Sequence, residues 1–139
     1  MTDRLQFINP PGWAAAKGYT NGVLVRGPTL YVAGQIGWNA EQELTTDDLG
    51  EQFAQALDNV LAVVRAAGGV PSDVAKMTIY VTDLAAYRAS TRAIGAAWRA
   101  RFGKHYPAMA LVAVSGLLEP RAKVEIETIA AVGHKEPAG

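Results

Sequence analysis

The sequence contains no cysteine and only two histidines. The absence of cysteine excludes a disulfide framework, a thiolate nucleophile and a cysteine-ligated metal. His105 and His134 lack the i, i+4 spacing of a helical zinc pair, and no glycine-rich phosphate loop is present. We interpret His105 as a solvated loop residue and His134 as a solvated residue of a polar tail, and we expect no metal site.

Net charge and long apolar runs are also absent. Lys and Arg total 13, Asp and Glu total 13, and the formal net charge is zero. This balance argues against nonspecific binding to nucleic acid or to an anionic membrane. No apolar run approaches the roughly 20 residues of a membrane span, and Met1 to Arg4 lead into a polar stretch rather than a signal-peptide core. We therefore expect a cytoplasmic protein with no nucleic-acid partner and no membrane partner.

What is present is the pattern of one α+β domain spanning 1–139, since half of the 139 residues are apolar. Apolar runs and alternation predict six strands, at 4–8, 22–26, 29–35, 74–82, 108–114 and 122–132. The second and third of these flank Gly27-Pro28, and we expect them to form a hairpin.

Two helices are predicted between these strands. The first runs from Leu49 to Val64, capped by Thr46 or Asp47 and ended by a glycine pair at 68–69. The second follows the N-cap Asp83 and stops at a glycine at 103.

The order of these elements favours one mixed sheet of about six strands, covered on one face by two helices. The other face must also be buried, because apolar residues such as Leu111 and Val112 point to both sides of their strand. Oligomerisation through that face is the solution we expect.

Glu125 and Glu127 lie two residues apart in the last predicted strand and should therefore share one face of it. Carboxylates fixed side by side repel each other, and such pairs can move protons in catalysis. A solvated polar face on a half-exposed strand is the other interpretation, and spacing alone favours it.

Six segments follow one another in a distinctive order along the chain: LYVAGQIG at 30–37, QALDNV at 55–60, AGG at 67–69, KMTIYVTD at 76–83, YPA at 106–108 and VEIETIA at 124–130. Together they resemble the Rid (reactive intermediate deaminase, also called YjgF) family, over a core of about 19–132 that leaves a polar tail at 133–139. The resemblance implies a chorismate-mutase-like (YjgF/L-PSP) α+β fold. It also implies a homotrimer in which the sheets form a central β-barrel and small-molecule clefts lie between subunits.

The resemblance further implies hydrolysis of 2-aminoacrylate-type enamines and imines to 2-keto acids and ammonia, without a metal or cofactor. Glu125 aligns with the glutamate that holds or activates the attacking water, and Tyr19 with a tyrosine of the site. Gly34 keeps the backbone N–H that lies near the substrate. Trp38 and Trp13 are candidates for walls of the pocket, and packing under a loop is an equal alternative for either.

Three positions depart from the family pattern. Met109 replaces an arginine that grips the substrate carboxylate, Ala33 replaces a serine, and Leu111 replaces a cysteine. Loss of a bidentate arginine contact costs about 2–5 kcal/mol of binding, so a neutral or aromatic ligand is favoured over a small amino-acid-derived enamine. The candidates for a substitute guanidinium are Arg26, Arg99, Arg101 and Arg121, but nothing in the sequence places any of them at the site.

These observations lead to two hypotheses. The first is a hydrolase of an enamine, imine or related C–N compound with altered substrate preference, and the second is a non-catalytic trimer that binds a small molecule, regulates or acts as a holdase. Ribonuclease activity, attributed to some relatives, finds little support in a neutral chain without a basic, aromatic-interleaved stripe.

Overall fold

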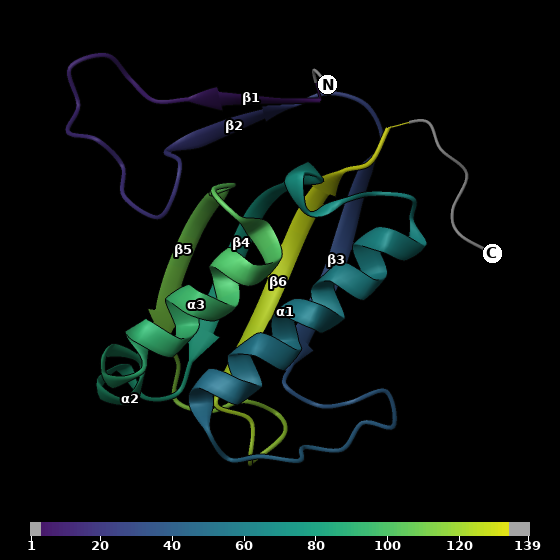
Figure 1. Ribbon diagram of the computed structural model, residues 1–139, viewed down its shortest axis with the longest axis vertical. Coiled ribbons are helices and arrows are strands. Elements are labelled where there is room, and N and C mark those ends of the chain that lie inside the picture. The colour runs from purple at the N-terminus through teal and green to yellow at the C-terminus, as the bar shows by residue number, and fades with distance from the viewer. Residues whose placement is uncertain (1–3, 134–139) are drawn as a thin grey trace.

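The computed structural model describes residues 4–133, which form ten elements (Figure 1). Their bounds are β1 Leu5–Ile8, β2 Gly22–Val25, β3 Thr29–Ile36, α1 Leu49–Ala66, the 3₁₀ turn η1 Pro71–Asp73, β4 Val74–Val81, α2 Leu84–Ala89, α3 Thr91–Phe102, β5 Ala108–Ala113 and β6 Val124–Ala131. The fold is a mixed α+β fold, as expected. None of the helices in this range is both long enough and apolar enough to cross a membrane.

The strands form two sheets rather than the single sheet expected. Four strands make the main sheet in the order β3-β6-β4-β5, in which β6 is antiparallel to both neighbours and β4 is parallel to β5. β1 and β2 form a separate antiparallel pair, which lies at one end of the main sheet (Figure 1).

The predicted hairpin around Gly27-Pro28 is therefore wrong. The N–H of Arg26 donates to the carbonyl of Arg4 and extends the β1–β2 ladder, whereas the carbonyl of Pro28 accepts from Val132 and extends the β3–β6 ladder. Gly27 adopts a φ of 90°, a conformation that glycine reaches without strain, and the chain passes there from one sheet to the other.

The two predicted helices are present, with corrections at their ends. Asp48 caps α1 by accepting the N–H of Glu51 at 2.9 Å, and Thr46, one of the expected caps, instead accepts the N–H of Asp48 at 3.0 Å. Asp83 caps α2 as expected. The second predicted helix is divided into α2 and α3, because the chain leaves helical geometry at Ser90.

α1 and α3 cover one face of the main sheet (Figure 1). On β4, Met77, Ile79 and Val81 are buried beneath the helices, and Thr78 and Tyr80 point to the other face, as their alternation predicted. We call that other side the open face. It carries bulky side chains in contact with solvent, among them Tyr31 at 74% exposure.

A part-buried ion pair attaches the small sheet to the main one. Arg4 donates to the carboxylate of Asp73 at 2.6 Å and to the carbonyl of Ala131 at 3.0 Å. Asp73 is only 2% exposed and also accepts the N–H of Val70. Breaking a buried pair leaves an uncompensated charge, so this contact fixes the position of β1.

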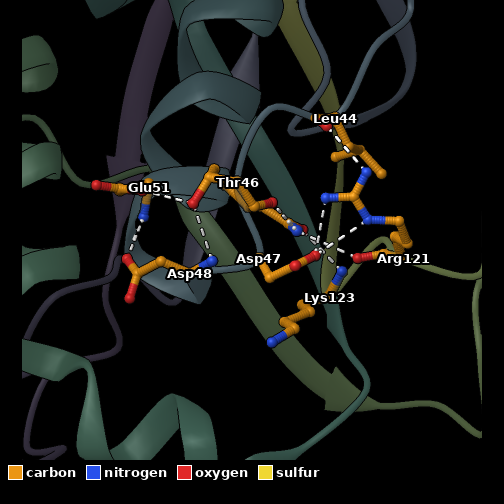
Figure 2. Close-up of polar contacts among 8 residues, drawn as sticks. Leu44, Thr46, Asp47, Asp48, Glu51, Arg121 and Lys123 are labelled. Carbon is orange, nitrogen blue, oxygen red and sulfur yellow. Dashed lines mark hydrogen bonds and ion pairs between the residues drawn. The ribbon is translucent and has the colours of Figure 1, made fainter.

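The buried amide of Gln52 connects three segments that meet at the start of α1. It donates to the carbonyls of Thr46 at 2.9 Å and Arg121 at 3.1 Å, and it accepts the N–H of Lys123 at 2.9 Å. Figure 2 shows this region, where Arg121 also binds Asp47. The side chain of Gln52 is fully buried, so each of these contacts is shielded from water.

Gly37 packs against the same residue from the end of β3. A Cβ at Gly37 would lie 2.6 Å from the Cα of Gln52, a distance at which backbone atoms would have to move. The end of β3 and the start of β6 are therefore held by one residue of α1.

We expect Gln52→Leu to lower the free energy of unfolding by about 2–4 kcal/mol, because two carbonyls and one N–H lose their partner in a part-buried environment. Urea denaturation measures this change. The matched variant Gln55→Leu, whose side chain bonds only to another side chain of α1, should cost less than about 1 kcal/mol. Equal losses in the two variants would contradict the role assigned to Gln52.

Candidate functional site

The structure brings Tyr19, Met109 and Leu111 together around a cavity of about 440 Å³. Met109 and Leu111 stand in register with Met77 and Ile79 of β4, which places them on the helix-covered face. We call this space the β5–α3 cavity, since residues of those two elements line most of it.

The segment that carries Tyr19 is fixed to the start of β5. Thr20 donates its N–H to the carbonyl of Pro107 at 3.0 Å and its hydroxyl to the carbonyl of Tyr106 at 2.6 Å. A single bridge between Thr20 and Ala108 continues the pairing. Tyr19 is therefore held beside the cavity by the hydrogen bonds of its neighbour Thr20.

The rings of Tyr87, Trp98 and Tyr106 contribute to the lining of the β5–α3 cavity. Trp98 stacks on Phe102 with ring centroids 4.2 Å apart and lies nearly parallel to Tyr106. Its indole N–H donates to the carbonyl of His105 at 3.1 Å. Tyr87 closes another side, and burial raises the pKa of its phenol above the ordinary value of 10.0.

His105 lies in a loop as expected, but it is not a solvated residue. Its Nε2 lies 2.7 Å from the carbonyl of Val74, and its ring lies 5.7 Å from that of Phe7. The imidazole therefore bridges the small sheet and β4. His134 lies outside the described residues. Between residues 4 and 133, no group of three or more His, Asp or Glu side chains is placed to hold a metal ion.

Gly34 and Glu125 form a second group of candidate residues. A Cβ built at Gly34 would lie 2.8 Å from Cδ of Glu125 and 3.0 Å from Cγ, and closer still to a carboxylate oxygen. A register shift between Val32 and Gln35 interrupts the β3–β6 ladder there. The Glu125 carboxylate thus lies directly against the backbone of Gly34, in a space that exists because residue 34 has no side chain.

The carboxylates of Glu125 and Glu127 share the open face, as their spacing predicted. Tyr80 pairs with Glu125 across β4 and β6, and its hydroxyl donates to the carboxylate of Glu127. That hydrogen bond, followed by burial and then by the charges of Glu127 and Glu125, raises the pKa of Tyr80 above 10.0. The open face therefore carries a phenol that is hydrogen-bonded to one carboxylate and lies within the electrostatic influence of a second.

The remaining predicted site residues lie apart from the cavity. Ala33 lines a shallow groove on the open face together with Lys76 and Glu127. Trp38 accepts a hydrogen bond from Asn59 through its carbonyl and does not line the β5–α3 cavity. Trp13 is 64% exposed and lines a different hollow near Tyr19.

The predicted site is thus split within one chain. Tyr19, Met109 and Leu111 surround the β5–α3 cavity on the helix-covered face, whereas Gly34 and Glu125 lie on the opposite face of the sheet. β4 and the thickness of the sheet separate the two groups.

Sequence reasoning did not place Arg99, Tyr87 or Trp98 at the site, although all three line the β5–α3 cavity. The two aromatic residues fall within the second predicted helix and were given no role in the site, and Arg99 was one of four arginines without a location. The only signal in the sequence was their helical spacing, which places these side chains on neighbouring faces of the helices that cover the sheet.

Comparisons with known proteins cover nearly the whole chain. A family model described as Endoribonuclease L-PSP matches residues 10–132. The 2-iminobutanoate/2-iminopropanoate deaminase of Escherichia coli (strain K12) is 36% identical over 133 residues, covering 94% of this chain and 98% of that protein. A protein of the same name from Dermatophagoides farinae is 35% identical over 115 residues, covering 82% and 85%.

Solved structures agree with these matches. The Rid-family protein YyfB of Yersinia pestis gives a TM-score of 0.82 at 33% identity, covering 92% of this chain and 98% of that one. The YjgF gene product of Escherichia coli gives a TM-score of 0.65 at 34% identity, covering 91% and 98%. The similarity therefore includes both groups of candidate residues.

We expect Glu127→Gln to lower the pKa of Tyr80 toward 10.0, because the acceptor that favours the protonated phenol loses its charge. The stabilisation from this hydrogen bond is complete below the ordinary pKa and is lost as pH rises through the raised one. Phenolate absorbance titrations of the two proteins measure the shift, and Tyr80→Phe identifies the phenol concerned. Superimposable curves for wild type and Glu127→Gln would refute the assignment.

Proposed function

This chain belongs to the Endoribonuclease L-PSP family, also known as the Rid or YjgF family, and from that premise we propose that it is an imine or enamine hydrolase. Its products would be a carbonyl compound and ammonia. The observation that carries the proposal is the contact of the Glu125 carboxylate with the backbone of Gly34. Relatives named 2-iminobutanoate/2-iminopropanoate deaminase, at 35–36% identity, support the reaction class.

The proposed reaction needs one water and one proton acceptor. Glu125 orients a water and accepts its proton as the oxygen attacks the imine carbon, which forms a tetrahedral carbinolamine. The same carboxylic acid returns that proton to nitrogen, which completes the neutral carbinolamine. Glu125 then carries the hydroxyl proton of this intermediate to nitrogen, the C–N bond breaks, and ammonia leaves as the carbonyl forms. The Gly34 N–H is the donor proposed for charge that develops near the reacting centre. Tyr19 positions the substrate.

The proposed substrate is bulkier than that of the named deaminases. Met109 has neither charge nor a strong donor, and Leu111 and the ring of Trp98 add apolar surface to the same cavity. A space of about 440 Å³ is within the range of pockets that enclose drug-sized molecules. These features favour a substrate with a large apolar body.

We further propose that the protein is a trimer with its sites between subunits. One chain places its two groups of candidate residues on opposite faces of the sheet, so one complete site requires groups from two chains. The open face also exposes Tyr31 and half-buries Ile129, which is typical of a surface that packs against a second copy.

A non-catalytic binding protein is the second candidate. Met109 is the observation that favours it, because a cavity can keep its shape and ligand after its catalytic anchor is lost. RNA cleavage, which the family description names, is not proposed, because 13 basic residues are balanced by 13 acidic ones.

We expect Glu125→Gln to lower kcat/KM for a bulky 2-imino acid by about 100-fold or more, because the proton acceptor is lost. The imine is generated in situ by an L-amino-acid oxidase, and keto-acid formation is followed. Gly34→Ala should also lower the rate, since its methyl group displaces the carboxylate. Glu127→Gln is the matched control and should remain within about threefold of wild type. An unchanged rate in Glu125→Gln would refute the mechanism, and no acceleration by wild type would favour the binding protein.

We expect Ile129→Arg to convert the trimer to a monomer, because it buries a charge in the proposed interface. Light scattering after size exclusion should show the mass fall from about three chains to one chain of 14.7 kDa, with loss of imine hydrolysis. Val70→Arg introduces the same charge at an exposed turn beyond the sheet and should leave the mass unchanged. A wild-type monomer, or an unaltered Ile129→Arg assembly, would contradict the proposal.

A further inference from the structure

The four arginines that could replace the carboxylate-binding arginine missing at position 109 differ in their surroundings. Arg101 is bound to Asp58 through two nitrogens, at 2.7 Å and 3.1 Å. Arg121 is bound to Asp47, and Arg26 follows β2, away from the β5–α3 cavity. Only Arg99 lines that cavity among the residues described.

Arg99 is also the single charged residue among the 14 that line the β5–α3 cavity between residues 4 and 133. Neither aspartate nor glutamate lines it, and within the same range the Arg99 guanidinium makes no hydrogen bond or ion pair, unlike those of Arg101 and Arg121. Its donors are therefore available to a ligand, and nothing in the lining would repel an anion.

Gly95 gives this guanidinium its position. Residues four apart share one face of a helix, and both Gly95 and Arg99 border the cavity. A Cβ at Gly95 would lie 3.1 Å from Nη1 of Arg99 and 3.9 Å from Cζ. The guanidinium therefore lies back over the helix at Gly95, in the space that a larger residue would fill.

The lining defines the chemistry of the ligand. A planar guanidinium forms a bidentate pair with a carboxylate, and it is the one cationic group present. The rings of Tyr87, Trp98 and Tyr106, with Met109 and Leu111, offer a large apolar surface beside it. The combination fits a carboxylate attached to a bulky apolar or aromatic body.

We propose that Arg99 recognises the substrate carboxylate, so that the anionic anchor lies on α3 rather than at position 109 of β5. The substrate class is then 2-imino acids with large apolar side chains, rather than neutral imines. The claim that the ligand is a substrate rests on the proposed function. Recognition of a carboxylate by Arg99 does not, and it is tested by binding alone.

The test compares two ligands that differ only in the anionic group, 2-oxo-4-phenylbutanoate and 4-phenylbutan-2-one, in which a methyl group replaces the carboxylate. Isothermal titration calorimetry of the full chain gives both dissociation constants. Arg99→Gln should weaken binding of the keto acid by about 10- to 100-fold and leave the neutral ketone within about threefold. Arg101→Gln, which removes a guanidinium outside the cavity, should change neither.

Gly95→Ala supplies a second variant that does not threaten folding, because alanine is favoured over glycine within a helix. Its methyl group crowds Nη1 of Arg99, so the keto acid should bind several-fold more weakly and the ketone unchanged. The proposal is overturned if wild type does not bind the keto acid or if Arg99→Gln binds it as tightly as wild type does. It is also overturned if Arg99→Gln weakens the binding of the keto acid and of the ketone equally.

The two proposals fail in different ways. Arg99-dependent binding without imine hydrolysis by wild type would refute the enzymatic function and keep the carboxylate site. Hydrolysis that depends on Glu125, combined with keto-acid binding that ignores Arg99, would keep the function and refute this inference.

Discussion

The position of the candidate carboxylate depends on the buried side-chain amide of Gln52. The amide oxygen of Gln52 accepts the N–H of Lys123, the residue before β6. The backbone of Gln52 leaves no room for a side chain at Gly37, the residue after β3. Gly34 and Glu125 lie on those two strands and approach so closely that no Cβ fits between them. Such a contact tolerates little displacement of either strand. One fully buried polar group, with all its contacts satisfied, holds both strands in position, which is the situation in which buried polar networks rigidify a fold.

The main sheet separates the cavity from the candidate catalytic carboxylates. The side that α1 and α3 cover contains a cavity suited to recognition, with apolar walls and one cation, whereas the open face contains the carboxylates and the phenol of Tyr80. A protein built this way can alter the wall at Met109 or the cation on α3 without touching Glu125. The open face has the opposite constraint. Ile129 and Glu125 share that face, so a substitution that disrupts the proposed packing against a second copy would also disturb the chemistry proposed for Glu125.

Much of this arrangement was predictable from the sequence, because it follows from local periodicity. The α1 helix, the alternation of β4 and the shared face of Glu125 and Glu127 were all correct. The errors arose where contacts between residues far apart in the sequence determine the structure. β2 pairs with β1 rather than β3 because the chain turns at Gly27, and His105 is held by the carbonyl of Val74, 31 residues away. Periodicity likewise could not place Arg99, because membership of a cavity depends on how α3 packs over β5.

The strand order β3-β6-β4-β5 has a consequence for synthesis on the ribosome. β6 is the last element of the described chain, yet it lies between β3 and β4 and pairs with both (Figure 1). Until it leaves the exit tunnel, β3 has no neighbour in the sheet, and α1 covers an incomplete surface. Contacts of such long sequence separation form late, and domains generally fold as units. The nascent chain therefore completes its sheet, and brings Glu125 against Gly34, only after β6 has been synthesised.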